Sequence, residues 1–227
     1  MTHKKSPTII LLGRSGSGKG TQANLLCERL GLRYIGTGEL LRKLGGEENF
    51  LGSKLKSVLA RGDLAPTWLA FYVWLRELAD ISPSHGVVFD GSPRMLREAK
   101  FLDEVFDWYE RKNIKVILID ISREEAFRRL TRRRICKECG TVISYEDVRE
   151  PQSNDELKEL KVCDRCGGGL ETRPDDDPEA VQNRMDWFEK EVLPVVEHYR
   201  KKDMLTVVNG EQSVQVVFKE IIKVVTI

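Results

Sequence analysis

The sequence contains no long apolar run and no excess of charge of either sign. The apolar segment after the two lysines in MTHKKSPTIILLG is too short for the hydrophobic region of a signal peptide, and no stretch approaches the roughly 18 apolar residues of a membrane span. Lys and Arg total 37 and Asp and Glu total 36, a formal net charge of +1, so no overall field attracts nucleic acid or an acidic membrane. We therefore expect a cytoplasmic protein that builds any anion site locally.

Cysteine is scarce, and no internal repeat or low-complexity segment is present. The five cysteines are an odd number, and four of them form two C-x-x-C pairs while Cys27 stands alone. This pattern indicates metal binding rather than a disulfide scaffold. Hydrophobic residues make up 41% and charged residues 32% of the chain, which excludes intrinsic disorder. A length of 227 residues favours one α/β domain with insertions over two independent folds.

Short β-branched runs alternate with longer stretches of helical period. This alternation predicts a parallel sheet with helices on its faces. The expected strands are residues 8–12, 33–35, 87–90, 115–121 and 205–208. The expected helices are residues 19–30, 38–44, 50–61, 67–79, 97–109, 123–132, 178–200 and 213–224.

Two segments interrupt this alternation. Residues 36–66 contain two short helices where one crossover would suffice, and residues 135–172 contain the paired cysteines and many charges but little helical period. We interpret both as insertions into a core formed by the rest of the chain. Pro194 lies inside the expected helix 178–200 and predicts a kink or a break there, because proline cannot donate the helical hydrogen bond.

The segment GRSGSGKGT, from Gly13 to Thr21, follows the first apolar strand and begins a helix, which is the context of a phosphate-binding loop. Its glycines let backbone N–H groups converge on phosphate oxygens, the helix N-terminus adds positive potential, and Lys19 reaches the terminal phosphates. A chance glycine-rich turn is disfavoured by the combination of strand, glycines, lysine and helix. Most such loops place Ser or Thr directly after the lysine, whereas here Gly20 intervenes, a variant that indicates a subset of nucleotide kinases.

A carboxylate and two arginines are candidates for the other side of this site. Asp90 ends the buried strand 87–90, a position typical of a residue that holds Mg²⁺ or its waters. A tight Gly/Pro turn then presents Arg94, whose planar guanidinium can bind two phosphate oxygens, and Arg42 offers a second such group from the first insertion. Each arginine alone is more often a solvated surface residue. Beside a phosphate loop, the two together favour phosphate binding.

The second insertion predicts a closed metal site. Cys136 and Cys139 form one knuckle and Cys163 and Cys166 the other, each followed directly by glycine. Four thiolates at this spacing suit a structural zinc ion, with iron as the minor possibility. A segment of about 40 residues has almost no core of its own, so the metal would fold it.

The chain resembles the adenylate kinase family in its long-lid form, over nearly its whole length. The matching segments, in order, are GRSGSGKGTQ, YIGTGELLR, ARGDLAP, VVFDGSPR, RRLTRRRICKECG, ETRPDDDPEAVQNR and VVNG. The resemblance implies a P-loop NTPase-type three-layer α/β/α fold with a five-stranded parallel sheet. It further implies a core of residues 1–35, 67–127 and 173–227, a nucleoside-monophosphate-binding insert of residues 36–66, and a zinc-binding lid of residues 128–172.

The resemblance also implies a reaction and the residues for it: Mg²⁺-dependent transfer from ATP to AMP by a monomer. Catalytic roles fall on Lys19, Asp90, Arg94, Arg129, Arg133, Arg173 and Arg184. ATP contacts fall on Gly13, Gly16, Ser17, Gly18, Lys19, Gly20, Thr21, Arg129, Arg133, Asn209 and Gly210. Monophosphate contacts fall on Thr37, Gly38, Arg42, Leu64, Gly91, Arg94 and Glu98. The resemblance makes four of these residues lid and hinge arginines, called the lid arginines below: Arg129, Arg133, Arg173 and Arg184. We expect the carboxylates of residues 175–177 to pair with them in one state of the enzyme and to release them in another.

Several positions depart from the family pattern and leave alternatives open. Glu98 stands where the family has the Gln that reads adenine, and Ser92 stands where it has Phe. An ionised Glu98 only accepts hydrogen bonds and suits the two donors of guanine, whereas a protonated Glu98 restores the adenine pattern. GMP, or CMP and UMP, are therefore alternative acceptors. The loop between the knuckles also lacks the usual His-x-x-Phe-x-Pro-Pro run.

Two other classes of function are alternatives to an active kinase of this family. One is a zinc ribbon that binds nucleic acid, against which the neutral charge and the acidic residues near the knuckles argue. The other is a homologue that binds nucleotide without turnover. Against it, Lys19, Asp90, Arg94 and the lid arginines are all present.

Overall fold

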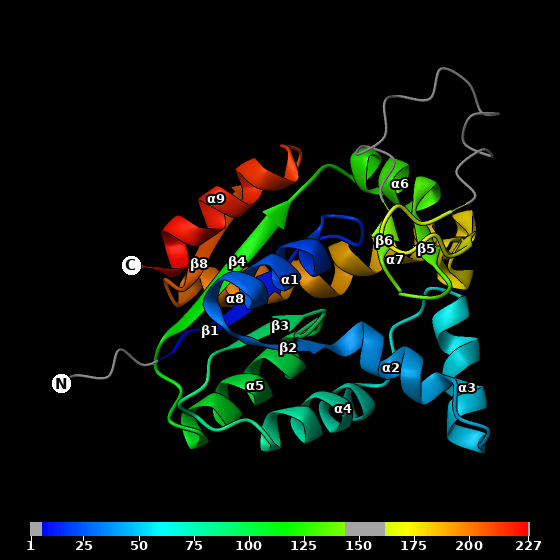
Figure 1. Cartoon of the computed structure of the whole chain (residues 1–227). Helices are drawn as coiled ribbons and strands as arrows, with labels where there is room; N and C mark the ends of the chain where they lie inside the picture. Colours follow the sequence, from blue (N-terminus) through cyan, green and yellow to red (C-terminus); the bar gives the residue numbers. More distant parts are fainter. Residues whose placement is uncertain (1–5, 144–161, 227) are drawn as a thin grey trace.

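The computed structural model describes residues 6–143 and 162–226 and has a five-stranded, all-parallel sheet at its centre (Figure 1). The strand order is β2-β3-β1-β4-β8. The strands are β1 (Thr8–Leu12), β2 (Arg33–Gly36), β3 (Val87–Asp90), β4 (Ile114–Asp120) and β8 (Leu205–Asn209). Because β1 lies between β3 and β4, the loop that follows it opens at the point where the strand order reverses, where ligands bind in open α/β sheets.

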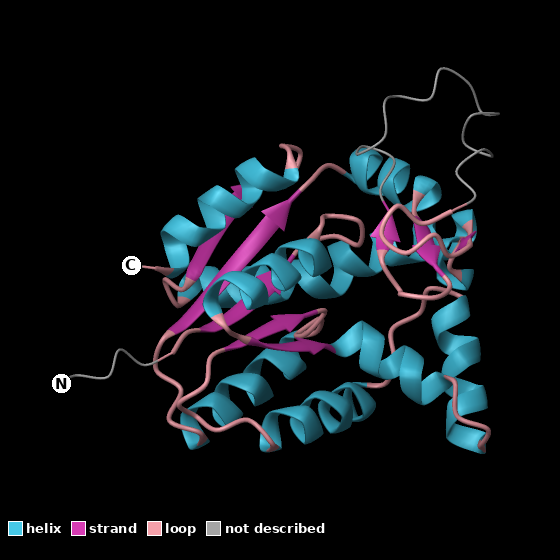
Figure 2. Cartoon of the chain, in the orientation of Figure 1, coloured by secondary structure: helices cyan, strands magenta, loops and turns pink. Residues whose placement is uncertain are grey.

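Helices cover both faces of this sheet (Figure 2). On one face, Ile9 and Leu11 of β1 pack with α1 (Lys19–Leu30) and α9 (Val214–Val225). On the other face, Ile10 and Leu12 pack with α4 (Thr67–Ala79), α5 (Leu96–Trp108) and α8 (Leu193–Lys201). The alternation follows from the two-residue period of a strand, and it confirms the three-layer arrangement expected from the sequence.

The expected elements match the structure within one residue at each end, with one exception. The expected helix 178–200 is three consecutive segments: α7 (Pro178–Trp187), a π-helical turn η3 (Phe188–Val192) and α8. The prediction of an interruption at Pro194 is therefore confirmed. Pro194 has no N–H and therefore cannot donate to the carbonyl one turn earlier, and its ring would clash with that carbonyl. The wider π-helical turn relieves this clash.

The first insertion contains the two expected helices, α2 (Thr37–Gly45) and α3 (Phe50–Ala60). The second insertion follows α6 (Arg123–Arg132) and forms a small antiparallel sheet of order β6-β5-β7. Its strands are β5 (Arg134–Cys136), β6 (Val142–Ile143) and β7 (Leu170–Glu171), and the chain returns through the 3-10 turn η2 (Pro174–Asp176). We call residues 134–143 and 162–171 the cysteine module. Most of the unusual segment between the knuckles lies outside the described residues.

Within the described ranges, none of the helices combines the length and the apolar character that crossing a bilayer would need.

Candidate functional site

The phosphate loop connects β1 to α1 in a backbone shape that requires glycine. Gly18 caps α1 with φ of +88°, and Gly13 has φ of +149°. A Cβ at Gly13 would also lie 2.6 Å from the Ser17 hydroxyl, and Ser17 is itself buried. The loop can therefore close tightly and turn its backbone N–H groups inward, as phosphate binding needs.

Lys19 lies folded into this loop. Its amino group donates to the carbonyl oxygens of Gly13 at 2.9 Å and Arg14 at 2.7 Å. The pKa of Lys19 is lowered to about 8, chiefly by burial and in addition by nearby arginines, while the Asp90 carboxylate opposes the change. A phosphate group would supply the negative charge that this desolvated amine lacks.

Two further cations face Lys19 across a cleft. Ser15, Lys19, Leu64, Gly91, Arg94 and Arg184 are among the residues that line it. Arg184, in α7, donates to the Ser15 hydroxyl at 3.2 Å, which ties that helix to the phosphate loop. Burial lowers the pKa of Arg184 to about 10, and Asp175 opposes this. Such a concentration of buried positive charge suits an anionic ligand.

A second pocket adjoins this cleft, and both are lined by Leu64, Gly91, Ser92 and Arg94. A Cβ at Gly38 would lie 3.4 Å from Arg42 Nη1 and 3.7 Å from Arg94 Nη2, so the two guanidinium groups converge at the start of α2. The buried Thr37 hydroxyl, which lines the pocket, has no hydrogen-bond partner among the described residues. These groups are the donors that a monophosphate requires.

Glu98 lies at the inner side of the second pocket and is 3% exposed. The Ser92 hydroxyl lies 2.5 Å from its Oε1, and the Arg94 backbone N–H donates to its Oε2 at 2.7 Å. Burial raises the pKa of Glu98, against the effect of these hydrogen bonds and of the Arg94 charge. The two departures from the family pattern are thus in direct contact, and burial favours the protonated carboxyl.

The lid arginines divide into two groups. Arg133 bonds to the Asp176 carboxylate through Nε at 2.8 Å and Nη2 at 2.5 Å, and Arg184 reaches the same carboxylate at 3.2 Å. The side chain of Asp176 is fully buried. Arg173 lies near this cluster, and burial lowers its pKa to about 10. The expected pairing of these carboxylates with lid arginines is therefore present in the structure.

Arg129 lies at another place, beside the loop after β8. It bonds to Glu125 at 2.5 Å and to the carbonyl oxygen of Gly210 at 3.0 Å. Asn209 at the end of β8 accepts from the Glu211 N–H at 2.9 Å and so shapes the same loop. Arg129, Asn209 and Gly210 thus lie together, and none of them is among the residues that line the two pockets.

Asp90, at the end of β3, faces the first turn of α1. A Cβ at Gly20 would lie 3.4 Å from its Oδ2, in van der Waals contact. Tyr34 of β2 donates toward the same oxygen at 3.1 Å. Tyr34 was not predicted as a site residue. The sequence hints at it only indirectly, through Gly36 two residues later at the end of the strand. Thr21 is exposed on α1.

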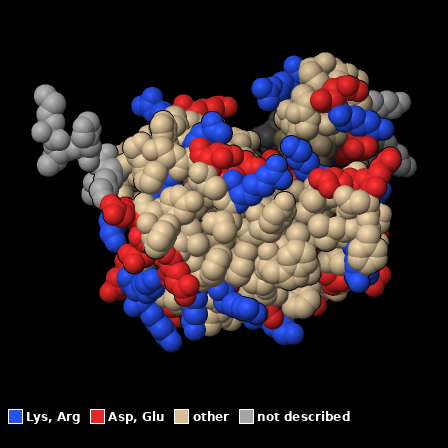
Figure 3. Space-filling view, turned by 90° about the horizontal axis from the view of Figure 1, so that it is seen from below, with Lys and Arg blue, Asp and Glu red and all other residues tan. Residues whose placement is uncertain are grey.

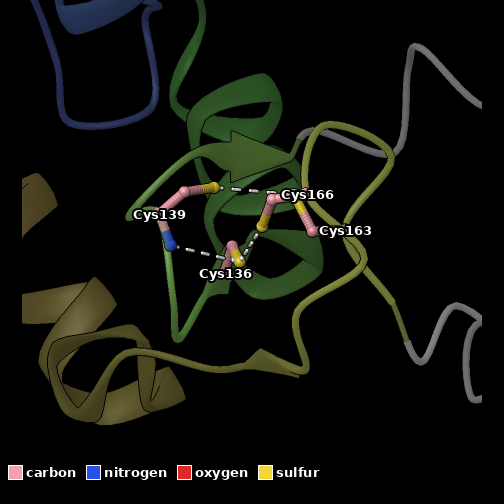
Figure 4. A group of neighbouring side chains, drawn as sticks. All are labelled: Cys136, Cys139, Cys163 and Cys166. Carbon is pink, nitrogen blue, oxygen red and sulfur yellow. Dashed lines mark hydrogen bonds between the residues drawn. The ribbon is translucent and has the colours of Figure 1, made fainter.

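The four paired cysteines converge, as Figure 4 shows. Their sulfur atoms all lie within 4.8 Å of one another, with 3.4 Å between Cys136 and Cys166 and 3.7 Å between Cys139 and Cys163. Four sulfur ligands about 2.3 Å from one zinc ion fit a cluster of this size. A Cβ at Gly168 would lie 2.9 Å from the Cys136 sulfur, so this glycine leaves room for the cluster. Cys27 is partly buried and packs against the core instead.

Charged side chains are mixed on the face that Figure 3 shows. Acidic and basic residues alternate there, with a broad uncharged area between them.

The sheet carries a phosphate loop after its central strand, next to a cation-lined cleft and an adjoining pocket with hydrogen-bond donors. These features together define a P-loop phosphotransferase. The comparisons with known proteins agree, because the family model described as adenylate kinase matches residues 11–204. An adenylate kinase of Methanocella arvoryzae is 38% identical over 213 residues, which is 94% of this chain and 95% of that protein. Adenylate kinases of Archaeoglobus fulgidus and Clostridium tetani are 36% and 35% identical over the same shares.

The chain belongs to the adenylate kinase family. It is therefore a nucleoside monophosphate kinase, a phosphotransferase with a cysteine cluster that fits zinc.

Proposed function

We propose that the chain transfers the terminal phosphoryl group of ATP to AMP, reversibly, giving two ADP. The observation that carries this proposal is the continuity of the two pockets. Arg94 lines both, with Lys19 and Arg184 on the donor side and Thr37 on the acceptor side. Two nucleotides bound there would meet at Arg94, where the phosphoryl group would be transferred.

The buried cations supply most of the catalysis in this proposal. Phosphoryl transfer passes through a loose transition state with charge spread over the equatorial oxygens, so the protein contributes position and positive charge. Lys19, Arg94 and Arg184 already lie in the cleft. Arg133 shares the Asp176 carboxylate with Arg184, and Arg173 lies near Arg133. No general base is needed, because the attacking group is an anionic phosphate.

Asp90 would hold magnesium or its water ligands. Its half-buried carboxylate faces the start of α1 and lies near Lys19, and carboxylate oxygens are the ligands that Mg²⁺ prefers. When bound with ATP, the ion neutralises charge on the phosphates. The role of this chain is to present the carboxylate at the edge of the phosphate loop.

The domain division expected from the sequence is part of the proposal: residues 128–172 as a lid and residues 36–66 as the acceptor insert, both closing on the core. Closure excludes water, which would otherwise accept the phosphoryl group. The end of the insert contacts α7, because Asn183 donates to the Arg61 carbonyl at 3.0 Å. Zinc bound by the four cysteines would make the lid rigid.

The Glu98 carboxyl selects the base in this proposal. When it is protonated, one oxygen can accept from the adenine amino group and the hydroxyl can donate to the adjacent ring nitrogen. The raised pKa of Glu98 supports that form. An ionised Glu98 would instead favour guanine, so GMP is the second candidate acceptor.

The experiment is a coupled assay of MgATP with AMP, GMP, CMP and UMP in turn. AMP as the preferred acceptor supports the proposal, and preference for GMP would assign the base selection to an ionised Glu98. Nucleotide binding without turnover would favour a non-catalytic homologue. That the protein is monomeric and cytoplasmic and binds neither nucleic acid nor membrane stays a prediction. Light scattering would test the monomeric state, and RNA-binding measurements at low salt would test the absence of nucleic acid binding.

A further inference from the structure

Tyr34 lies across the end of β2 and contacts the Asp90 carboxylate. In the sheet, Tyr34 is paired with Val88 and Gly36 with Asp90. Residues two apart in a strand share a face, so the Tyr34 ring lies on the side of the sheet to which Gly36 belongs. Its hydroxyl lies 3.1 Å from Asp90 Oδ2 and 3.3 Å from Glu39 Oε1.

Gly36 provides the space for this ring. Its φ is −96°, a conformation open to any residue, so the backbone does not require glycine there. A Cβ at Gly36 would lie 2.6 Å from both Cε1 and Cζ of Tyr34. Contacts this short do not occur, so any larger residue at this position would displace the tyrosine.

The Tyr34 hydroxyl stands between two carboxylates from different parts of the chain. Asp90 ends a core strand, whereas Glu39 belongs to the first turn of α2 in the acceptor insert. Ionised carboxylate oxygens only accept hydrogen bonds, so the Tyr34 hydroxyl between them acts as the donor. One donor shared by two acceptors fits the two rather long distances.

We propose that Tyr34 is a positioning residue for a magnesium ion held by Asp90. The Tyr34 ring occupies the space left by Gly36, and its hydroxyl orients the Asp90 carboxylate toward the phosphate loop. The inference rests on the proposed metal role of Asp90. Hydrogen-bond partners of a metal-binding carboxylate fix its orientation, and their removal typically weakens metal binding or activity by about 10-fold to 100-fold. The same hydroxyl links the metal site to the start of the acceptor insert through Glu39.

The test compares Tyr34→Phe with a control, Tyr72→Phe, which removes the hydroxyl of an exposed tyrosine on α4. Binding of Mn²⁺ to the protein with a non-hydrolysable ATP analogue is measured by electron paramagnetic resonance, independently of turnover. We expect Tyr34→Phe to weaken Mn²⁺ binding about 10-fold and to raise the Mg²⁺ concentration for half-maximal activity by a similar factor. The KM values for ATP and AMP at saturating Mg²⁺ should stay within about twofold, since Tyr34 lines neither pocket.

A second variant, Gly36→Ala, keeps the hydroxyl and both carboxylates but displaces the ring. It should show the same loss of Mn²⁺ affinity, with a thermal melt that confirms folding. Unchanged Mn²⁺ affinity in either folded variant would overturn the inference. The proposed function fails separately, if the wild-type protein binds Mn²⁺ and the ATP analogue but transfers no phosphoryl group to any monophosphate.

Discussion

Around the central sheet, two groups of buried side chains fill both faces, with Trp74, Phe89 and Phe106 among residues that have no exposed surface. In the described part of the cysteine module, the corresponding cluster consists of Cys136, Ile143 and Cys163, with Leu170 against it. Apolar burial can therefore stabilise the core, whereas we expect the module to depend on a metal ion held by its four cysteines.

Loss of the metal should produce the largest difference in stability between the core and the cysteine module. We expect Cys163→Ser to lose zinc and hydrogen-exchange protection in the cysteine module while β1, β3 and β4 keep theirs. Structural zinc contributes about 10–16 kcal/mol to the folding of small zinc-finger peptides, more than a cluster of this size can replace. Metal analysis and hydrogen exchange measure both effects. Cys27→Ser is the control and should retain one zinc per chain. Equal loss of protection in the sheet would contradict the distinction.

Substitution of Lys19 should affect chemistry and leave the core folded. We expect Lys19→Met to lower kcat/KM about 100-fold to 1000-fold, the usual cost of removing one group that stabilises transition-state charge. Its melting temperature should not fall, because the substitution removes a desolvated charge.

The pH dependence of the wild-type enzyme tests the same residue. The pKa of Lys19 is lowered from 10.5 to about 8, so the free enzyme loses this positive charge near pH 8. The kcat/KM for ATP should therefore fall as the pH rises through about 8. A flat profile up to pH 10 would show that Lys19 keeps its proton.

Two substitutions on α5 test the stability of the core. Leu102 is fully buried, whereas Trp108 is 86% exposed on the same helix. We expect Leu102→Ala to lower the free energy of unfolding by about 3 kcal/mol and Trp108→Ala by less than about 0.5 kcal/mol. Denaturant titration measures both. Zinc content should be unchanged in each variant, since the module does not depend on this packing.

The smallest expected effect is on base selection. Glu98→Gln should keep AMP as the acceptor within about threefold at low pH, because glutamine offers an amide N–H donor and a carbonyl acceptor at any pH. The wild type should lose AMP activity relative to this variant as the pH rises, since ionisation of Glu98 removes its donor. Parallel pH profiles for the two proteins would argue against a protonated Glu98.

The sequence was sufficient to predict the elements built from local pattern. The strand 8–12, the glycine loop and the helix 19–30 are consecutive, so their composition alone defines them. Tyr34 was not found, because its partners Asp90 and Glu39 are brought to it by the pairing of β2 with β3 and by the start of α2.

Other contacts escaped prediction for the same reason. Arg14 lies 4.3 Å above the ring of Phe188, the first residue of the π-helical turn, and donates to the carbonyl oxygen of Ile121, just after β4, at 3.2 Å. The small sheet of the cysteine module has strands of only two or three residues, too short for a detectable alternation. Long-range packing, rather than local propensity, places these residues.

Phosphorus NMR of the purified protein with MgATP and AMP tests the central claim, direct transfer within a closed cleft, most directly. The account predicts that the ATP signals give way to ADP, two molecules per ATP consumed, with no matching growth of inorganic phosphate. Release of inorganic phosphate at the rate of ATP loss would contradict it, because water rather than AMP would then be the acceptor.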